Sequence, residues 1–87
     1  MKSKLLTIIN HYGINNQQRK LEEEVFELQE AITKYEITNH IKDIEEELAD
    51  VQVLLDQIRY YYNIDWENIN KVMIRKIERQ LERIKNE

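Results

Sequence analysis

The sequence predicts an all-α protein built on an antiparallel helical hairpin, and three observations support this fold class. The 87 residues include no proline and one glycine, so few positions interrupt a helix. Apolar residues make up 41% and charged residues 34%, which fits one small folded domain over residues 1–87 and argues against a disordered tail. Apolar residues also recur at alternating spacings of three and four, the period of an amphipathic helix.

The apolar pattern and the capping residues predict four helices in order. The first covers about residues 3–12, and Gly13 is its expected C-terminal cap. The second covers about residues 16–35. The third runs from residue 39 or 40 to about 62, with Asn39 as a candidate N-cap. Asp65 is expected to cap the fourth, from residue 66 to about 85.

Each of the two middle helices carries an apolar seam suited to packing on a neighbour. The seams consist of Leu21, Val25, Leu28, Ile32 and Tyr35 in the second helix and of Ile44, Leu48, Val51, Leu55, Ile58 and Tyr62 in the third. Shifting the second helix by 23 residues superimposes Leu21 on Ile44 and aligns the two segments as an internal pseudo-repeat.

Carboxylates follow one edge of both seams. At about 100° per residue, Glu24 lies about 60° and Glu27 about 120° from Leu21, on the same side. Glu47 and Asp50 lie at the same offsets from Ile44, so an antiparallel hairpin can gather four carboxylates. Further glutamates point to the far side, where solvent is expected, namely Glu23, Glu30 and Glu46.

Four carboxylates in a half-buried patch repel one another, each close pair by on the order of 1 kcal/mol or more. Hard divalent cations relieve this repulsion, and Mg²⁺ shares its oxygen ligands with substrate phosphates. The pattern therefore indicates a magnesium site. The alternative from spacing alone is a set of surface glutamates that form ordinary i, i+4 pairs.

Composition and charge exclude several classes of protein. The net charge of −4 argues against a general nucleic-acid binder, because only residues 71–85 are basic. The longest apolar run is three residues, far too short for a membrane span. The absence of cysteine excludes disulfides and thiolate sites and suits a cytoplasmic protein. A chain this small with many apolar residues is expected to complete its four-helix arrangement as a homodimer or homotetramer.

Two segments resemble the EExxE…ExxD signature of the all-α nucleoside triphosphate pyrophosphohydrolases, specifically MazG-like proteins. The first segment runs from Lys20 to Leu28, and the second is Glu47-Leu-Ala-Asp50. The resemblance extends through residues 17–21, 62–65 and 76–79 and covers roughly residues 5–80. Single ExxE motifs are common on helices, but the paired set with its flanking leucines is more specific.

The resemblance implies a Mg²⁺-dependent enzyme, with Mn²⁺ as a substitute ion, that hydrolyses nucleoside triphosphates to monophosphate and pyrophosphate through a metal-activated water. It implies as metal ligands Glu24, Glu27, Glu47 and Asp50. Glu23 and Glu24 match its catalytic glutamates, although the predicted direction of Glu23 away from the seam fits a catalytic role only if a second subunit covers that side. Lys76 and Arg79 match its basic, phosphate-binding positions.

Two alternatives remain open from the sequence. A phosphoribosyl-ATP pyrophosphatase shares the helical scaffold, but this chain lacks the usual N-terminal stretch of that family. A non-catalytic helical interaction module would keep the apolar seams and use no metal. Such a module gives no reason for four acids along the seam edges, so the carboxylates favour the enzyme.

Overall fold

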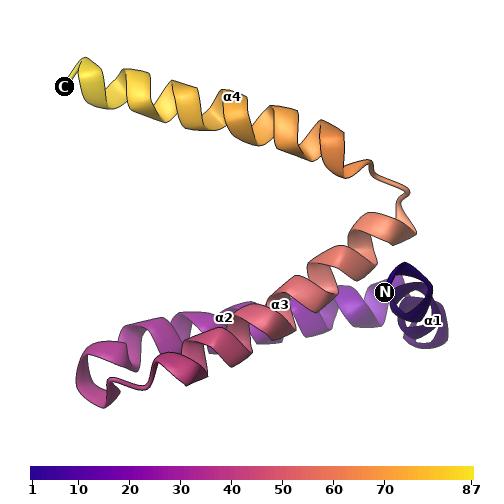
Figure 1. Cartoon of the computed structure of the whole chain (residues 1–87). Coiled ribbons are helices and arrows are strands. Elements are labelled where there is room, and N and C mark those ends of the chain that lie inside the picture. Colours follow the sequence, from indigo (N-terminus) through magenta and orange to yellow (C-terminus); the bar gives the residue numbers. More distant parts are fainter.

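The computed structural model describes residues 1–87, which form four helices and no strand. The helices are α1 (Lys2–Tyr12), α2 (Ile14–Thr38), α3 (Ile41–Tyr61) and α4 (Trp66–Lys85). Helices α2 and α3 lie side by side as an antiparallel hairpin, α1 packs at the end of the hairpin away from its turn, and α4 projects from the end of α3 (Figure 1). The predicted all-α hairpin is confirmed.

Most of the predicted helix ends are confirmed. Gly13 adopts a φ of 89° between α1 and α2, and its amide donates to the Ile9 carbonyl at 2.8 Å. The Asp65 carboxylate accepts a hydrogen bond from the Glu67 amide at 3.0 Å, as expected of an N-cap. The prediction that Asn39 caps the third helix is wrong. Asn39 instead ends α2 in a left-handed conformation, with φ at 57°, which asparagine tolerates better than most residues.

A small core joins the first three helices. Four apolar side chains are buried, and they come from α1 and α3: Leu5, Ile9, Val51 and Leu54. Two glutamines are buried beside them. The Gln17 amide on α2 donates to the Gln57 side-chain oxygen on α3 at 2.8 Å, which satisfies both groups away from water.

The predicted apolar seams are only partly buried. Helices α2 and α3 meet along the edge that carries Glu24 and Glu47, so the seams are turned partly outward. The resulting open apolar face consists of four side chains that are 46%, 53%, 51% and 44% exposed, respectively Val25, Ile32, Leu48 and Leu55. Tyr62, expected in the core, is also exposed.

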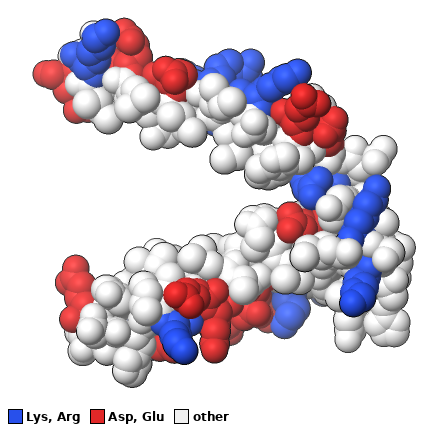
Figure 2. Space-filling view, in the orientation of Figure 1, with Lys and Arg blue, Asp and Glu red and all other residues white.

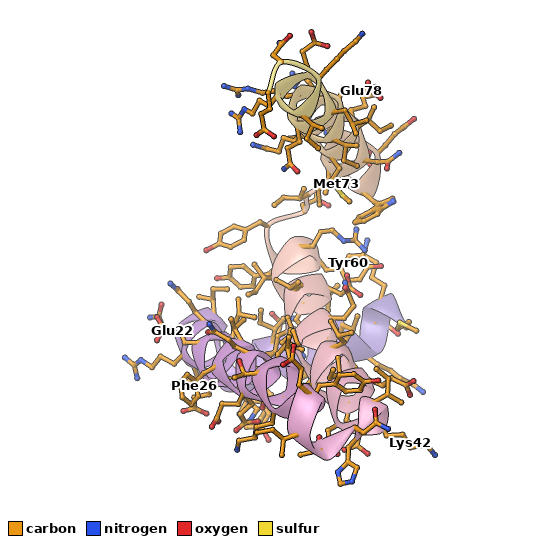
Figure 3. The ribbon with its side chains drawn as sticks, turned by 90° about the vertical axis from the view of Figure 1, so that its left-hand side faces the viewer. Glu22, Phe26, Lys42, Tyr60, Met73 and Glu78 are labelled. Carbon is orange, nitrogen blue, oxygen red and sulfur yellow. The ribbon has the colours of Figure 1, made fainter.

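Helix α4 packs against none of the other helices. Figure 3 shows its Met73 on the side facing the hairpin and Glu78 on the opposite side. The radius of gyration is 16.1 Å, whereas a compact domain of this length has about 12 Å. Helix α4 therefore lies outside the core that the first three helices form. No helix combines the length and apolar character that crossing a membrane requires.

Candidate active site

The hairpin brings three of the predicted metal ligands together. Glu24 and Glu27 lie one turn apart on α2, and Glu47 lies on the facing edge of α3. One carboxylate oxygen from each of these residues lies within 4.8 Å of the others. This cluster forms because the carboxylate edges of the two helices face each other beside the partly buried seams.

Two oxygens of this cluster are buried without a partner. Oε2 of Glu24 and Oε2 of Glu47 are both shielded from solvent and accept no hydrogen bond. The remaining oxygen of Glu24 lies 3.5 Å from Nζ of Lys20, and the Glu24 side chain is only 12% exposed. An unsatisfied buried acceptor costs free energy, and more when it is charged. The cluster is therefore short of positive charge and of hydrogen-bond donors.

The same environment raises the pKa values of two glutamates above the ordinary 4.5. For Glu24 the main cause is loss of hydration, followed by the nearby negative charges of Glu27 and Asp50, while Lys20 partly opposes the shift. The pKa of Glu47 is raised by desolvation first and then by Glu27, Asp50 and Glu24. A cation placed among these carboxylates would lower their pKa values again, because its positive charge favours the ionised form.

Asp50, the fourth predicted ligand, lies beside the cluster at an exposed position on α3. Its charge contributes to the raised pKa values of both Glu24 and Glu47, so it belongs to the same electrostatic site.

Glu23 lies on a different side of α2. It is exposed and lines an open surface hollow together with Glu22, Phe26, Glu27 and Glu30. Figure 3 shows Glu22 and Phe26 on the side of α2 away from α3. The structure therefore separates Glu23 from the buried oxygens of Glu24 and Glu47, in agreement with the direction predicted from helix geometry.

The predicted phosphate-binding residues lie on α4. Lys76 and Arg79 are exposed and line a hollow with Arg75 and Glu78. Because α4 packs against no other helix, a single chain does not bring them to the carboxylates.

A groove beside the cluster adds residues that the sequence analysis did not single out. It lies between α2 and α3 and is lined by Glu27, Glu30, Ala31, Lys34, Thr38, Asp43 and Glu47. Glu27, Ala31, Lys34 and Thr38 follow one another at spacings of four, three and four. These four residues thus follow the helical period that located the carboxylates, and they extend the same edge of α2 toward the hairpin turn.

The family model for the MazG nucleotide pyrophosphohydrolase domain matches residues 13–84. The chain belongs to this family. Searches of curated proteins and of solved structures gave no significant match. Family membership makes the chain a nucleotide pyrophosphohydrolase and confirms the MazG-like resemblance. It favours an enzyme over the alternative of a non-catalytic interaction module.

MazG proteins are generally metal-dependent, and the carboxylate cluster fits a hard cation. Mg²⁺ binds oxygen at about 2.0–2.1 Å, so two ligands on opposite sides of one ion lie about 4 Å apart. The spread of ligand oxygens here is within 4.8 Å, and Glu24 and Glu47 each have a buried oxygen free to coordinate. The donor set is all carboxylate, which suits Mg²⁺ or Mn²⁺ better than soft metals.

Proposed function

We propose that this MazG-family enzyme hydrolyses nucleoside or deoxynucleoside triphosphates between the α and β phosphates, giving a monophosphate and pyrophosphate. The observation that carries the proposal is the pair of buried, unpartnered oxygens of Glu24 and Glu47 beside Glu27. Two buried carboxylate oxygens without a hydrogen-bond partner are unfavourable unless a cation joins them.

Glu24, Glu27, Glu47 and Asp50 would hold Mg²⁺, with Mn²⁺ as a substitute. When bound, the ion supplies positive charge to the substrate phosphates and acidifies a water. The hairpin itself fixes the direction of the ligands, because Glu24 and Glu47 are anchored on two packed helices. Ligands held in place in this way would stabilise the charge that develops at phosphorus in the transition state more than they stabilise the ground state.

The remaining residues have separate roles in the proposal. Glu24 and Glu23 are the proposed catalytic glutamates, and Glu24 has the better support because its carboxylate lies in the buried cluster. Glu23 would act only if a second copy covers its side of α2. Lys76 and Arg79 would bind the departing pyrophosphate, and their two cations would offset part of its negative charge. The proposal also includes self-association as a homodimer or homotetramer.

The experiment is phosphorus NMR of a panel of ribo- and deoxynucleoside triphosphates, with and without Mg²⁺. The expected products are monophosphate and pyrophosphate, formed only with metal. Glu47→Gln should abolish turnover, whereas Glu46→Gln, an exposed neighbour outside the cluster, should keep it. Diphosphate plus phosphate as products, or equal turnover by Glu47→Gln, would overturn the proposal.

A further inference from the structure

The direction of α4 relative to the hairpin is set where α4 leaves α3, because α4 packs against no other helix of the chain. Figure 2 shows uncharged surface on the side of α4 that faces the hairpin, with Lys, Arg, Asp and Glu gathered along the opposite side. A change in the angle between α3 and α4 would move all of these side chains. The elbow, residues 59–66, therefore determines the position of every group that α4 carries.

Backbone hydrogen bonds close the turn at the elbow. The Ile64 amide donates to the Arg59 carbonyl at 3.0 Å, and the Asn63 amide donates to the Tyr60 carbonyl at 3.1 Å. Asn63 has a left-handed φ of 54°, a conformation in which asparagine is enriched. These bonds order the backbone as far as residue 64, so the orientation of α4 beyond it depends on side-chain contacts.

The Arg59 side chain contacts all three parts of the elbow. Its guanidinium donates a long hydrogen bond of 3.5 Å to the Ile64 carbonyl in the turn. Its Cζ lies 4.2 Å from the centre of the Tyr60 ring on α3 and 5.9 Å from that of Trp66, the first residue of α4. A guanidinium is attracted to the face of an aromatic ring within about 6 Å. Arg59 therefore links the end of α3, the turn and the start of α4.

The Tyr60 ring on which Arg59 lies is itself tied to the body of the fold. Nζ of Lys2, on α1, lies 5.5 Å from the centre of the same ring. Figure 3 shows Tyr60 at the end of α3 that leads to α4. The elbow cluster, consisting of Lys2, Arg59, Tyr60 and Trp66, thus connects α1, α3 and α4 through side chains.

The environment of Arg59 is unlike that of an ordinary surface arginine. Its side chain is 17% exposed, and its Nε is buried and donates no hydrogen bond. The nearest carboxylate oxygen, Oδ1 of Asp56, lies 3.8 Å from Nε and accepts a hydrogen bond from Gln52 instead. Burying a cation with incomplete hydrogen bonding costs free energy, so the ion pair with Asp56 does not account for the buried position. The two aromatic rings account for it better, because cation–π attraction is stronger for a desolvated cation.

We propose that Arg59 is a positioning residue that fixes the angle between α3 and α4. Its consequence for catalysis rests on the proposed function, in which Lys76 and Arg79 bind phosphate. Lys76 lies ten residues after Trp66, about 15 Å along the helix, so a tilt of about 10° at the elbow would move it by about 3 Å. Such a displacement is large, because misplacing a substrate-binding group by about 1 Å can cost on the order of 100-fold in rate.

Spin-label distances test the geometry without any need for activity, because the chain has no cysteine of its own. Labels on Lys42→Cys in α3 and Glu82→Cys in α4, both exposed positions, report where α4 lies relative to the hairpin. An excess of unlabelled chain restricts the measured distances to pairs within one chain. Arg59→Gln should broaden or shift the distance distribution, whereas Arg19→Gln, at an exposed arginine on α2, should leave it unchanged.

Two further variants separate the elbow contact from a general loss of structure. Arg59→Lys keeps the charge but not the planar guanidinium, so it should change the distribution as Arg59→Gln does. Trp66→Leu removes the aromatic partner on α4 and leaves α3 unchanged, so it should have a similar effect even if Arg59→Gln destabilises α3. Circular dichroism checks that each variant keeps its helical content. A wild-type distance distribution in any of the three variants would overturn the proposal.

Kinetics test whether Arg59 acts through α4. Arg59→Gln should lower kcat/KM by about 10-fold, and it should cause no further loss in the residual turnover of Lys76→Ala/Arg79→Ala, because the groups that it positions are then absent. Losses that add in the triple variant would overturn the link to Lys76 and Arg79, while wild-type turnover of triphosphate still supported the proposed function. No turnover by the wild type would instead overturn the proposed function, and the distances alone would then decide the role of Arg59 at the elbow.

Discussion

Gln17 on α2 and Gln57 on α3 share a buried hydrogen bond of 2.8 Å across the hairpin. Seven residues after Gln17 lies Glu24, and seven residues before Gln57 lies Asp50. Three residues further along each helix lie Glu27 and Glu47. In an antiparallel pair with this register, the carboxylates of α2 lie opposite those of α3, so the glutamine bond and the carboxylate cluster fit the same register.

Removing one of these glutamines should destabilise the hairpin. Gln57→Leu leaves the Gln17 amide buried without an acceptor, which costs about 1–3 kcal/mol. Urea unfolding measures this loss. Gln17→Leu/Gln57→Leu should recover part of the stability, because neither partner is then left unpaired. Gln29→Leu, at an exposed position on α2, is the control. Additive losses in the double variant would show that the two side chains do not interact.

Divalent cations should stabilise the folded chain. At about 100 times its Kd, Mg²⁺ adds about 2.7 kcal/mol, which raises the Tm of a domain this small by about 10 °C or more. Calorimetry with Mg²⁺ and with EDTA measures the shift. Glu24→Gln should lose most of the shift and Glu46→Gln should keep it. An equal shift in both variants would place the cation elsewhere.

The raised pKa values of Glu24 and Glu47 predict a pH dependence of the metal-free protein. Both carboxyls hold their protons more tightly in the folded state than in the unfolded state. Their contribution to the free energy of unfolding is therefore fully present below pH 4.5. It is lost as the pH rises through the raised values. In EDTA, the unfolding free energy should therefore fall as the pH rises above 4.5.

The variant Glu24→Gln/Glu47→Gln should remove this part of the pH dependence, measured by urea unfolding at several pH values. Glu46→Gln should follow the wild type. Saturating Mg²⁺ should reverse the trend for the wild type, because protons compete with the cation for the same oxygens. A profile that is unchanged in the double variant would contradict the assignment of the two raised pKa values.

The cap at Asp65 should control the start of α4. Asp65→Ala removes the acceptor of the Glu67 amide and should destabilise the first turn by about 1 kcal/mol. Hydrogen exchange at Glu67 and Asn68 measures this local opening. Asp65→Asn should keep the protection, because asparagine caps about as well. Faster exchange in both variants would assign the effect to charge rather than to the cap.

Local periodicity was enough to predict that carboxylates of the two middle helices meet in the hairpin. A spacing of three places Glu24 and Glu27 on one helix edge, and the repeat of that spacing at Glu47 and Asp50 predicts their meeting in a hairpin. The caps Gly13 and Asp65 were equally local features, because each acts within a few residues of its own helix end.

Other features had no local signal. Gln57 points away from the α3 seam. It is buried because it contacts Gln17, which lies 40 residues earlier in the sequence, and because α1 packs against α3. The sequence also did not show which side of the hairpin carries the open apolar face. An apolar stripe indicates that a helix packs on something, and it does not distinguish the neighbouring helix of the same chain from another copy. Asn39 was misassigned because it suits both a helix start and a left-handed helix end.

The most direct test of the metal site is a crystal structure of the chain grown with Mn²⁺, with anomalous data collected at the manganese edge. We predict a peak between Glu24, Glu27 and Glu47, with both buried oxygens as ligands. Crystals of Glu24→Gln grown in the same way should lack the peak. Mn²⁺ bound only outside this cluster, in crystals of a protein that turns over triphosphate with Mn²⁺, would contradict the account.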